Sequence, residues 1–313
     1  MNGFGHRHLL DLDGYSRTDI EYVLDAAESM AEILDRQVPQ VPALRGVKLA
    51  NMFFESSTRT RISFELAAKA LGAEVINFAS AGSSLSKGES MVDTLATVAA
   101  LGADMFVMRH ARAGAPHLAA RILDGPVINA GDGCHAHPSQ GLLDALTIRR
   151  RFGSVDGLRV VIVGDIRHSR VARSNVLALG KLGAELVLCG PPQLVPGQLA
   201  AMPAVSIESD LDRAAAGADV LMGLRIQRER MSGPWLASTG EYVASYSIRR
   251  RHIESAGEGA ILMHPGPQNT GVEIEPDLAD SDRSVISEQV TAGLAVRMAV
   301  IYLLARNVLR VES

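Results

Sequence analysis

The chain has 313 residues, 47% of them hydrophobic and 21% charged, a balance that excludes a largely disordered protein. Its 31 Lys and Arg against 35 Asp and Glu give a net charge of −4, which argues against a nucleic-acid partner. With two cysteines, neither a disulfide framework nor a zinc site made of cysteine alone is expected. At roughly 150 residues per domain, the length predicts about two domains.

The N-terminal region contains no apolar run of signal-peptide length. The most apolar stretch, 292–305, is shorter than the roughly 20 residues that cross a bilayer, and Arg297 interrupts it. We therefore expect this stretch to be a buried helix. We also expect a cytoplasmic protein that has no membrane partner.

The first predicted helix begins at Ser16, because Ser16 and Asp19 have capping-box spacing and apolar residues then recur with the helical period until Pro39. Short apolar runs then alternate with amphipathic stretches. These runs are Val47–Phe54, Val75–Phe78, Met105–Met108, Val127–Ile128, Val160–Val163, Leu186–Cys189, Val220–Met222 and Ile261–Met263. Apolar strands between helices predict an α/β fold of two domains, each a mostly parallel sheet with helices on both faces.

A domain boundary is predicted where a helical stretch ends in Arg149–Gly153 and a new strand follows. This gives a first domain of residues 1–150 and a second of residues 151–287. The last predicted helix, 288–306, is apolar on nearly every face, so it must be buried on several sides. We expect it to pack back onto the first domain.

The strongest chemical signal lies between a predicted strand and a predicted helix. This segment contains Ser57, Thr58, Arg59, Thr60 and Arg61. A helix N-terminus presents unpaired backbone N–H groups and a positive dipole end. Two guanidiniums and several hydroxyls at that point predict a site for an anion, most plausibly phosphate. An ordinary helix capped by Ser57, with surface arginines, is the alternative.

Three further loops of the first half carry polar side chains. Lys87 lies in a Ser-rich loop, where Ser86 and Glu89 have capping-box spacing. Arg109 directly follows a predicted strand, where binding crevices of parallel sheets form. His137 and Gln140, three residues apart at a helix start, suit a pair of donors to a carbonyl group.

A metal site at Cys134, His135 and His137 is disfavoured, because the sequence contains no second ligand pair with matching spacing. In the second half, Arg167 and Arg170 flank a helix start that follows Gly164. One glycine there, where a dinucleotide fingerprint has three, argues against a bound dinucleotide. We expect no cofactor and no metal.

Arg225 follows another predicted strand, and a rigid Pro265-Gly266-Pro267 turn follows the last one. No Ser-His-Asp order, catalytic carboxylate pair or metal set accompanies these residues. Cationic groups at many strand ends of an acidic protein therefore suggest two anionic substrates that react directly. Catalysis would then depend on positioning and on stabilisation of charge.

These motifs resemble a known family. The segment from Ser57 to Arg61 is similar to the carbamoyl-phosphate signature of the transcarbamoylases. The segments 137–140 and 263–267 resemble the aspartate branch of that family, and the resemblance extends from about His8 to Arg306. The chain is thus identified as a member of the aspartate/ornithine transcarbamoylase family.

The resemblance implies two α/β domains, the first binding carbamoyl phosphate and the second L-aspartate. It implies transfer of the carbamoyl group to aspartate without a covalent intermediate, which gives N-carbamoyl-L-aspartate and phosphate in pyrimidine (UMP) biosynthesis. It also implies a homotrimer with active sites shared between subunits. Whether a regulatory chain or a dihydroorotase joins the trimer is left open.

The resemblance assigns carbamoyl phosphate to residues with matching motifs, through side chains or, in the last two, the backbone: Ser57, Thr58, Arg59, Thr60, Arg109, His137, Gln140, Gly266 and Pro267. Among them, Thr60, Arg109 and His137 polarise the carbamoyl oxygen. The aspartate set is Lys87 from a neighbouring subunit, Arg170, Arg225 and Gln227. With Arg59, Thr60, Arg109 and His137, Lys87 completes the catalytic set.

Two alternatives stay open. An ornithine-type enzyme carries a His-Cys-Leu-Pro turn where this chain has His264-Pro265-Gly266-Pro267, and Arg170 with Arg225 suits a dicarboxylate better than a cationic amino acid. A non-catalytic, anion-binding homologue is the second alternative. The chain departs from many relatives at 269–271, where Asn-Thr-Gly replaces Asn-Arg-Gly.

Overall fold

The computed structural model describes residues 4–79, 90–227, 230 and 238–309. The chain forms two compact units. Unit 1 comprises Met1–Leu143 and Thr291–Ser313, and unit 2 comprises Asp144–Val290. The division falls inside a helix, α5 (Pro138–Phe152), rather than at its end near residue 150. No turn signal lies inside α5, so the sequence predicts a domain boundary only where this helix ends.

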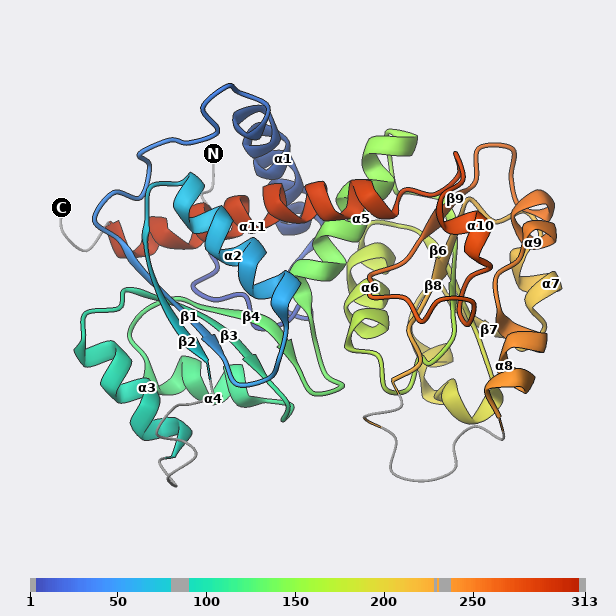
Figure 1. Ribbon diagram of the computed structural model, residues 1–313, viewed down its shortest axis with the longest axis horizontal. Coiled ribbons are helices and arrows are strands. Elements are labelled where there is room, and N and C mark those ends of the chain that lie inside the picture. Colours follow the sequence, from blue (N-terminus) through green and yellow to red (C-terminus); the bar gives the residue numbers. More distant parts are fainter. Residues whose placement is uncertain (1–3, 80–89, 228–229, 231–237, 310–313) are drawn as a thin grey trace. The chain divides into compact units, whose positions relative to one another are not determined.

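Unit 1 contains a parallel four-stranded sheet with the order β2-β1-β3-β4 (Figure 1). The strands are β1 (Lys48–Phe53), β2 (Glu74–Ala79), β3 (Met105–His110) and β4 (Val127–Asp132). Each contains most or all of the apolar run that predicted it. The strands β1 and β4 are buried along nearly their whole length, as expected for a sheet covered on both faces.

Helices cover both faces of this sheet (Figure 1). They are α1 (Arg17–Leu34), α2 (Thr58–Ala70), α3 (Met91–Ala100), α4 (Ala115–Ile122), the start of α5 and most of α11 (Ile286–Leu309). On one face, Ala50 and Met52 of β1 and Phe106 of β3 pack with Leu95 of α3 and Ala119 of α4. On the other face, Asn51 of β1 donates from its Nδ2 to the carbonyl of Arg61 in α2 at 3.1 Å, so α2 covers that side of the sheet.

Helix α11 belongs to the core of unit 1. Among the described residues it is the one helix long and apolar enough to cross a membrane, over Ile286–Arg306, and 72% of that window is buried. Arg297 is 6% exposed, and its Nη1 donates a hydrogen bond to Ser63 Oγ at 2.8 Å. The same guanidinium lies 5.3 Å from the ring centroid of Phe64. This contact attaches the end of the chain to α2.

Unit 2 contains a parallel five-stranded sheet with the order β7-β6-β5-β8-β9. The strands are β5 (Arg159–Val163), β6 (Glu185–Cys189), β7 (Val205–Glu208), β8 (Val220–Gly223) and β9 (Ile261–Met263). Four were predicted, and β7 was missed. Strand β7 is only partly covered, with no residue fully buried, so its sequence lacks an apolar run.

The helices of unit 2 again lie on both faces of the sheet (Figure 1). They are α6 (Arg170–Lys181), α7 (Leu211–Ala215), α8 (Thr239–Tyr246), α9 (Arg250–Ser255) and α10 (Pro276–Ala279), with short 3-10 turns η2 (Pro192–Leu194) and η3 (Gly197–Ala201). One core layer joins Val161 and Leu221 of the sheet to Leu211, Ile253 and Leu278 of three helices. The predicted α/β architecture is therefore confirmed.

Two helix ends differ from expectation. The capping box of Ser16 and Asp19 is confirmed, but α1 ends at Leu34, before Pro39, where the apolar pattern has already stopped. Helix α3 begins after Ser90, whose hydroxyl accepts a hydrogen bond from the backbone N–H of Asp93 at 3.2 Å. The predicted cap at Ser86 was therefore four residues early, and Ser86 and Glu89 themselves lie outside the described residues.

Candidate active site

Three neighbouring strands bring the predicted groups of unit 1 to one edge of the sheet. Strand β3 lies between β1 and β4, and Phe53 at the end of β1 pairs with Arg109 at the end of β3. The backbone N–H of Phe54 also donates to the Arg109 carbonyl at 2.9 Å. Arg59 follows β1 and His137 follows β4, so both lie beyond the carboxyl ends of strands next to β3. This is where parallel sheets form binding crevices.

The Ser57–Thr60 segment forms the first turn of α2. Ser57 occupies the N-cap position with an extended backbone, as predicted, but within the described chain its side chain makes no capping hydrogen bond. Thr60 is 9% exposed, whereas Arg59 is exposed. A helix start whose cap hydroxyl is not used by the helix retains its capacity to bind an anion.

Arg109 is held in one direction by two partners. Its Nη2 donates to Glu55 Oε1 at 3.0 Å, and its Nη1 donates to the carbonyl of Ala130 at 3.2 Å. The side chains of Arg109 and Glu55 are 12% and 23% exposed. Sequence reasoning assigned Glu55 no role, although a lone acid in a segment rich in arginine is a usable signal. The pair orients the guanidinium at the carboxyl end of β3.

His137 and Gln140 lie at the start of α5, as predicted, with Pro138 as the first helical residue. They are 5% and 8% exposed. The backbone N–H groups of Gln140 and Gly141 donate to the His137 carbonyl at 2.9 and 3.2 Å. These backbone hydrogen bonds hold His137 and Gln140 next to each other at the start of the helix.

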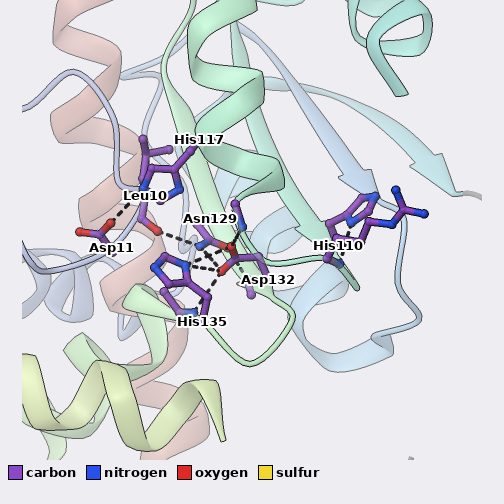
Figure 2. Close-up of polar contacts among 11 residues, drawn as sticks. Leu10, Asp11, His110, His117, Asn129, Asp132 and His135 are labelled. Atoms are coloured by element: carbon purple, nitrogen blue, oxygen red, sulfur yellow. Dashed lines mark hydrogen bonds and ion pairs between the residues drawn. The ribbon is translucent and has the colours of Figure 1, made fainter. Parts of the chain in front are cut away.

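A buried carboxylate, Asp132, closes the loop that carries His137 (Figure 2). Its Oδ1 accepts hydrogen bonds from Asn129 Nδ2 at 2.8 Å and from the backbone N–H of Ala136 at 3.1 Å. Its Oδ2 accepts from the backbone N–H of Gly114 at 2.7 Å. Burial alone would raise the pKa of Asp132, but hydrogen bonds from His135 and Asn129 lower it overall. The loop is therefore braced by a carboxylate anion.

In unit 2, Arg170 and Arg225 follow two adjacent strands, β5 and β8, whose ends pair at Val163 and Gly223. Arg170 is the first residue of α6 and is 3% exposed, beside an N-cap serine that accepts from Ala172 N–H at 3.1 Å. Arg225 is half-buried. The Nε2 of Gln227 donates to the carbonyl of Arg225 at 3.4 Å.

Two buried carboxylates that sequence reasoning did not identify hold these loops. Asp165 Oδ2 accepts from the backbone N–H of Gln227 at 3.3 Å. Glu273, 1% exposed, accepts from the backbone N–H of Ile226 at 3.1 Å and from Asn269 N–H and Nδ2 at 2.8 and 2.6 Å. Glu273 thus connects the segment after β8 to the segment after β9. The sequence around Glu273 carries no signal for this role.

The Pro-Gly-Pro turn follows β9, next to β8. The backbone N–H of Gly266 donates to His264 Nδ1 at 2.8 Å, and Gly266 has a φ of +59°, a conformation that favours glycine. Pro267 follows it in the same turn. The backbone of this turn is therefore held in place by a buried histidine.

The structure thus gathers the predicted residues into two groups, one in each unit. The group of unit 1 contains Ser57, Thr58, Arg59, Thr60, Arg109, His137 and Gln140, and that of unit 2 contains Arg170, Arg225, Gln227, Gly266 and Pro267. Lys87 lies outside the described residues. Both groups can bind anions through guanidiniums and helix starts.

The fold and these two groups define an α/β protein of two domains, each with cationic groups beyond the carboxyl ends of its strands. Residues 7–150 match the family model described as the aspartate/ornithine carbamoyltransferase carbamoyl-P binding domain. Residues 156–304 match the Asp/Orn binding domain of the same family. The chain belongs to the aspartate/ornithine carbamoyltransferase family.

Similar proteins agree with this assignment. The chain is 54% identical over 302 residues to the aspartate carbamoyltransferase catalytic subunit of Roseiflexus sp. (strain RS-1), covering 96% of this chain and 95% of the relative. It is 52% identical to that of Deinococcus radiodurans, covering 95% and 94%. The catalytic subunit of M. jannaschii aspartate transcarbamoylase has a TM-score of 0.86 at 36% identity, covering 96% and 99%.

A second solved structure carries a ligand. The aspartate transcarbamoylase from Trypanosoma cruzi in complex with carbamoyl phosphate has a TM-score of 0.85 at 31% identity, with 95% of each chain covered. With identities of 31% to 54% along both units, these proteins resemble the chain in sequence as well as in fold. The recognition of the family from sequence motifs is confirmed.

Proposed function

We propose that the chain transfers the carbamoyl group of carbamoyl phosphate to L-aspartate, giving N-carbamoyl-L-aspartate and phosphate. The observation that carries this proposal is the pair of guanidiniums, Arg170 and Arg225, on adjacent strand ends of unit 2. Two cations suit the two carboxylates of aspartate. The similar structure from T. cruzi in complex with carbamoyl phosphate and aspartate supports the same substrate pair.

Unit 1 supplies the side chains that bind carbamoyl phosphate. Arg59 and the first turn of α2 bind the phosphate, with Ser57, Thr58 and Thr60 as hydroxyl donors. Arg109, Thr60 and His137 donate to the carbamoyl oxygen, and Gln140 accepts from the carbamoyl amino group. His137 acts as a neutral donor in this scheme. Its fixed position at the start of α5 supports that role, because a donor that is already in place costs little reorganisation.

The neutral amine of aspartate attacks the carbamoyl carbon and forms a C–N bond. The carbonyl π electrons move to oxygen, giving a tetrahedral oxyanion, which collapses and breaks the bond to the phosphate oxygen. Phosphate leaves with that electron pair and accepts the proton that the amine loses. Each substrate brings about two negative charges, so several cationic groups are needed to bring them together. Positioning and charge stabilisation account for the catalysis.

The alternatives are an ornithine-type enzyme and an anion-binding homologue without activity. Purified protein is given radiolabelled carbamoyl phosphate with aspartate or with ornithine, and the labelled product is identified. We expect N-carbamoyl-aspartate and no citrulline. Formation of citrulline would favour the ornithine-type enzyme, and no product with either amine would favour the binding homologue. Growth without uracil of a bacterial strain that lacks this activity, restored by the chain, would support a role in pyrimidine synthesis.

We further propose a homotrimer in which Lys87 reaches the active site of a neighbouring subunit. The family resemblance supports this arrangement, and Lys87 itself lies outside the described residues. Lys87→Ala and His137→Ala are each inactivating in this scheme. After the two variants are dissociated and reassociated together, some sites regain both groups, and activity well above either parent is expected. Mixed trimers that are verified by mass spectrometry but stay inactive would contradict the sharing of sites.

A cytoplasmic location is also proposed, with the two free thiols Cys134 and Cys189 in its support. Whether a regulatory chain or a dihydroorotase joins the trimer is tested by purifying the tagged protein from its own cells. Co-purification of a second chain in fixed stoichiometry would identify such a partner. Recovery of the tagged protein from the membrane or exported fraction would contradict the location.

A further inference from the structure

Three side chains of the kinds that bind metal ions converge at the end of β4. They are His117 of α4, Asp132 at the end of β4 and His135 in the following loop, and their ligand atoms all lie within 4.8 Å of one another. Figure 2 shows both imidazoles beside the Asp132 carboxylate. The sequence argued against a metal here because it offered no ligand pair with matching spacing. His117 is the third ligand, and only the fold brings it next to the other two.

The conformation of the backbone after β4 brings these three side chains together. Gly133 has a φ of +46°, and a Cβ there would lie 2.8 Å from the backbone nitrogen of Ala113. The turn after β4 therefore packs tightly against the segment that leads into α4. The N–H of Gly114 at the start of α4 donates to Asp132 Oδ2 at 2.7 Å. These contacts place the first turns of α4 next to Asp132 and His135.

His117 is oriented as a metal ligand would be. Its Nε2 lies 3.0 Å from Asp11 Oδ2, and this carboxylate accepts the Nε2–H. The lone pair of the neutral ring is then on Nδ1, which is buried and has no hydrogen-bond partner among the described residues. Histidines that bind a metal commonly donate the hydrogen of their second ring nitrogen to a carboxylate, which fixes the tautomer.

The spacing fits a small transition-metal ion. His135 Nδ1 and Asp132 Oδ2 are 3.1 Å apart. Two ligands that are each about 2.0–2.1 Å from a tetrahedral Zn²⁺ lie about 3.3 Å apart, close to this distance. The imidazole rings of His117 and His135 have centroids 5.4 Å apart, and both side chains are partly exposed, so the rings have room to adjust.

The ligand set selects the class of metal. Two imidazoles and one carboxylate suit Zn²⁺, Co²⁺ or Ni²⁺, whereas Mg²⁺ and Ca²⁺ take oxygen ligands. Asp132 is fully buried and already accepts hydrogen bonds from Asn129, Ala136 and Gly114, so it is rigid. Three protein ligands leave a fourth position to water.

We propose that His117, Asp132 and His135 form a site for a divalent transition metal of the Zn²⁺ class. The ion cross-links α4 to the loop between β4 and α5, which carries His137 two residues beyond His135. The carboxylate of Asp11 supports the site by orienting His117. The proposal does not depend on the reaction that the chain catalyses.

The test uses the full-length protein, stripped of metal with a chelator and then titrated with Zn²⁺ or with Co²⁺. Isothermal titration calorimetry should show about one Zn²⁺ per chain. Tetrahedral Co²⁺ should give intense visible absorption, and Mg²⁺ should compete with neither ion. His117→Gln and His135→Gln should each weaken Zn²⁺ binding by more than about 100-fold, and Asp11→Asn by about 10- to 100-fold, the range known for carboxylates that orient a ligating histidine.

The matched control is His6→Gln. His6 Nε2 lies 3.1 Å from Asp19 Oδ2, a histidine–carboxylate pair that lacks the second imidazole, so this variant should bind Zn²⁺ as the native chain does. Circular dichroism and the metal-free melting temperature establish that each variant is folded. Zn²⁺ should raise the melting temperature of the native chain and of His6→Gln, but not of the ligand variants. Unchanged binding in folded His117→Gln and His135→Gln, or no Co²⁺ absorption by the native chain, would overturn the proposal.

Discussion

Glu55 Oε1 accepts a hydrogen bond from Arg109 Nη2 at 3.0 Å, although the two residues are 54 positions apart. Both side chains are mostly buried, with 12% of Arg109 and 23% of Glu55 exposed. An ion pair in this setting is screened less by solvent than one at the surface. Glu55 thereby fixes the direction in which Arg109 presents its remaining N–H groups.

Replacement of Glu55 tests this positioning role. We expect Glu55→Gln to lower kcat by roughly 10- to 100-fold, because a small misplacement of a catalytic group is costly. The KM for carbamoyl phosphate should change less, and Glu55→Asp should restore part of the rate. Steady-state kinetics measure both constants. Glu65→Gln is the control, since Glu65 is similarly exposed at 22% but pairs with Lys69; equal losses in both variants would contradict the role.

Arg59 is expected to bind the phosphate and to interact more strongly as charge develops on the leaving group. Arg59→Ala should therefore lower kcat by at least about 100-fold, the scale of a preorganised electrostatic contact. The rate of product formation at saturating substrates is the measurement. Lys69→Ala, which removes an exposed cation from the same helix, should leave kcat unchanged. A near-normal kcat for Arg59→Ala would rule out this assignment.

Arg225 is expected to bind a carboxylate of aspartate. Arg225→Ala should raise the KM for aspartate far more than that for carbamoyl phosphate, with a loss of roughly 1.5–3 kcal/mol for a charge-assisted hydrogen bond. Arg213→Ala removes an exposed cation of the same unit and should change neither KM. Equal effects on the two substrates would mean that unit 2 does not bind aspartate.

The capping box of α1 makes part of the stability depend on pH. The hydrogen bond from the Ser16 side chain is the main cause that lowers the pKa of Asp19 below its ordinary 3.8. A carboxyl group with a lowered pKa in the folded state stabilises the fold above its ordinary value, and this contribution is lost as the pH falls through the lower, folded-state value. Asp19→Asn should therefore be less stable than the native chain near neutral pH.

Urea unfolding of the two proteins from neutral pH to below pH 3.8 measures this difference. The gap in the free energy of unfolding should shrink only in the acid range, where the native Asp19 becomes protonated. Asp25→Asn serves as the control on the same helix, outside the capping box. A gap that stayed constant across the whole range would show that the charge of Asp19 contributes nothing.

The sequence predicts eight of the nine described strands because buried parallel strands are continuous apolar runs. Strand β7 has no fully buried residue, so Val205–Glu208 needs no such run. The start of α1 was predictable because Ser16 and Asp19 are neighbours in sequence, whereas Ser90 was passed over for an equally suitable serine nearby. Local sequence patterns predict helices and strands well, but they do not decide which of two nearby serines caps a helix.

In the candidate site, too, local patterns predict some residues, whereas contacts that depend on the fold could not be predicted. Arg59, Arg109 and Arg225 could be predicted because each follows an apolar strand within a few residues. Glu55 with Arg109 and Glu273 with Ile226 could not, because each pair joins segments that only the sheet order brings together. The convergence of His117 on Asp132 likewise depends on packing, not on spacing along the chain.

Unit 1 is interrupted in sequence, since residues from Thr291 onward complete it after the whole of unit 2 has been passed. Arg297 and Ser63, which form a hydrogen bond, are 234 positions apart. A growing chain emerges from the ribosome N-terminus first, so the first 143 residues must wait for α11 before Arg297 can cover Phe64. Unit 2, by contrast, is one continuous segment. The unit that is synthesised first is therefore the one that is finished last.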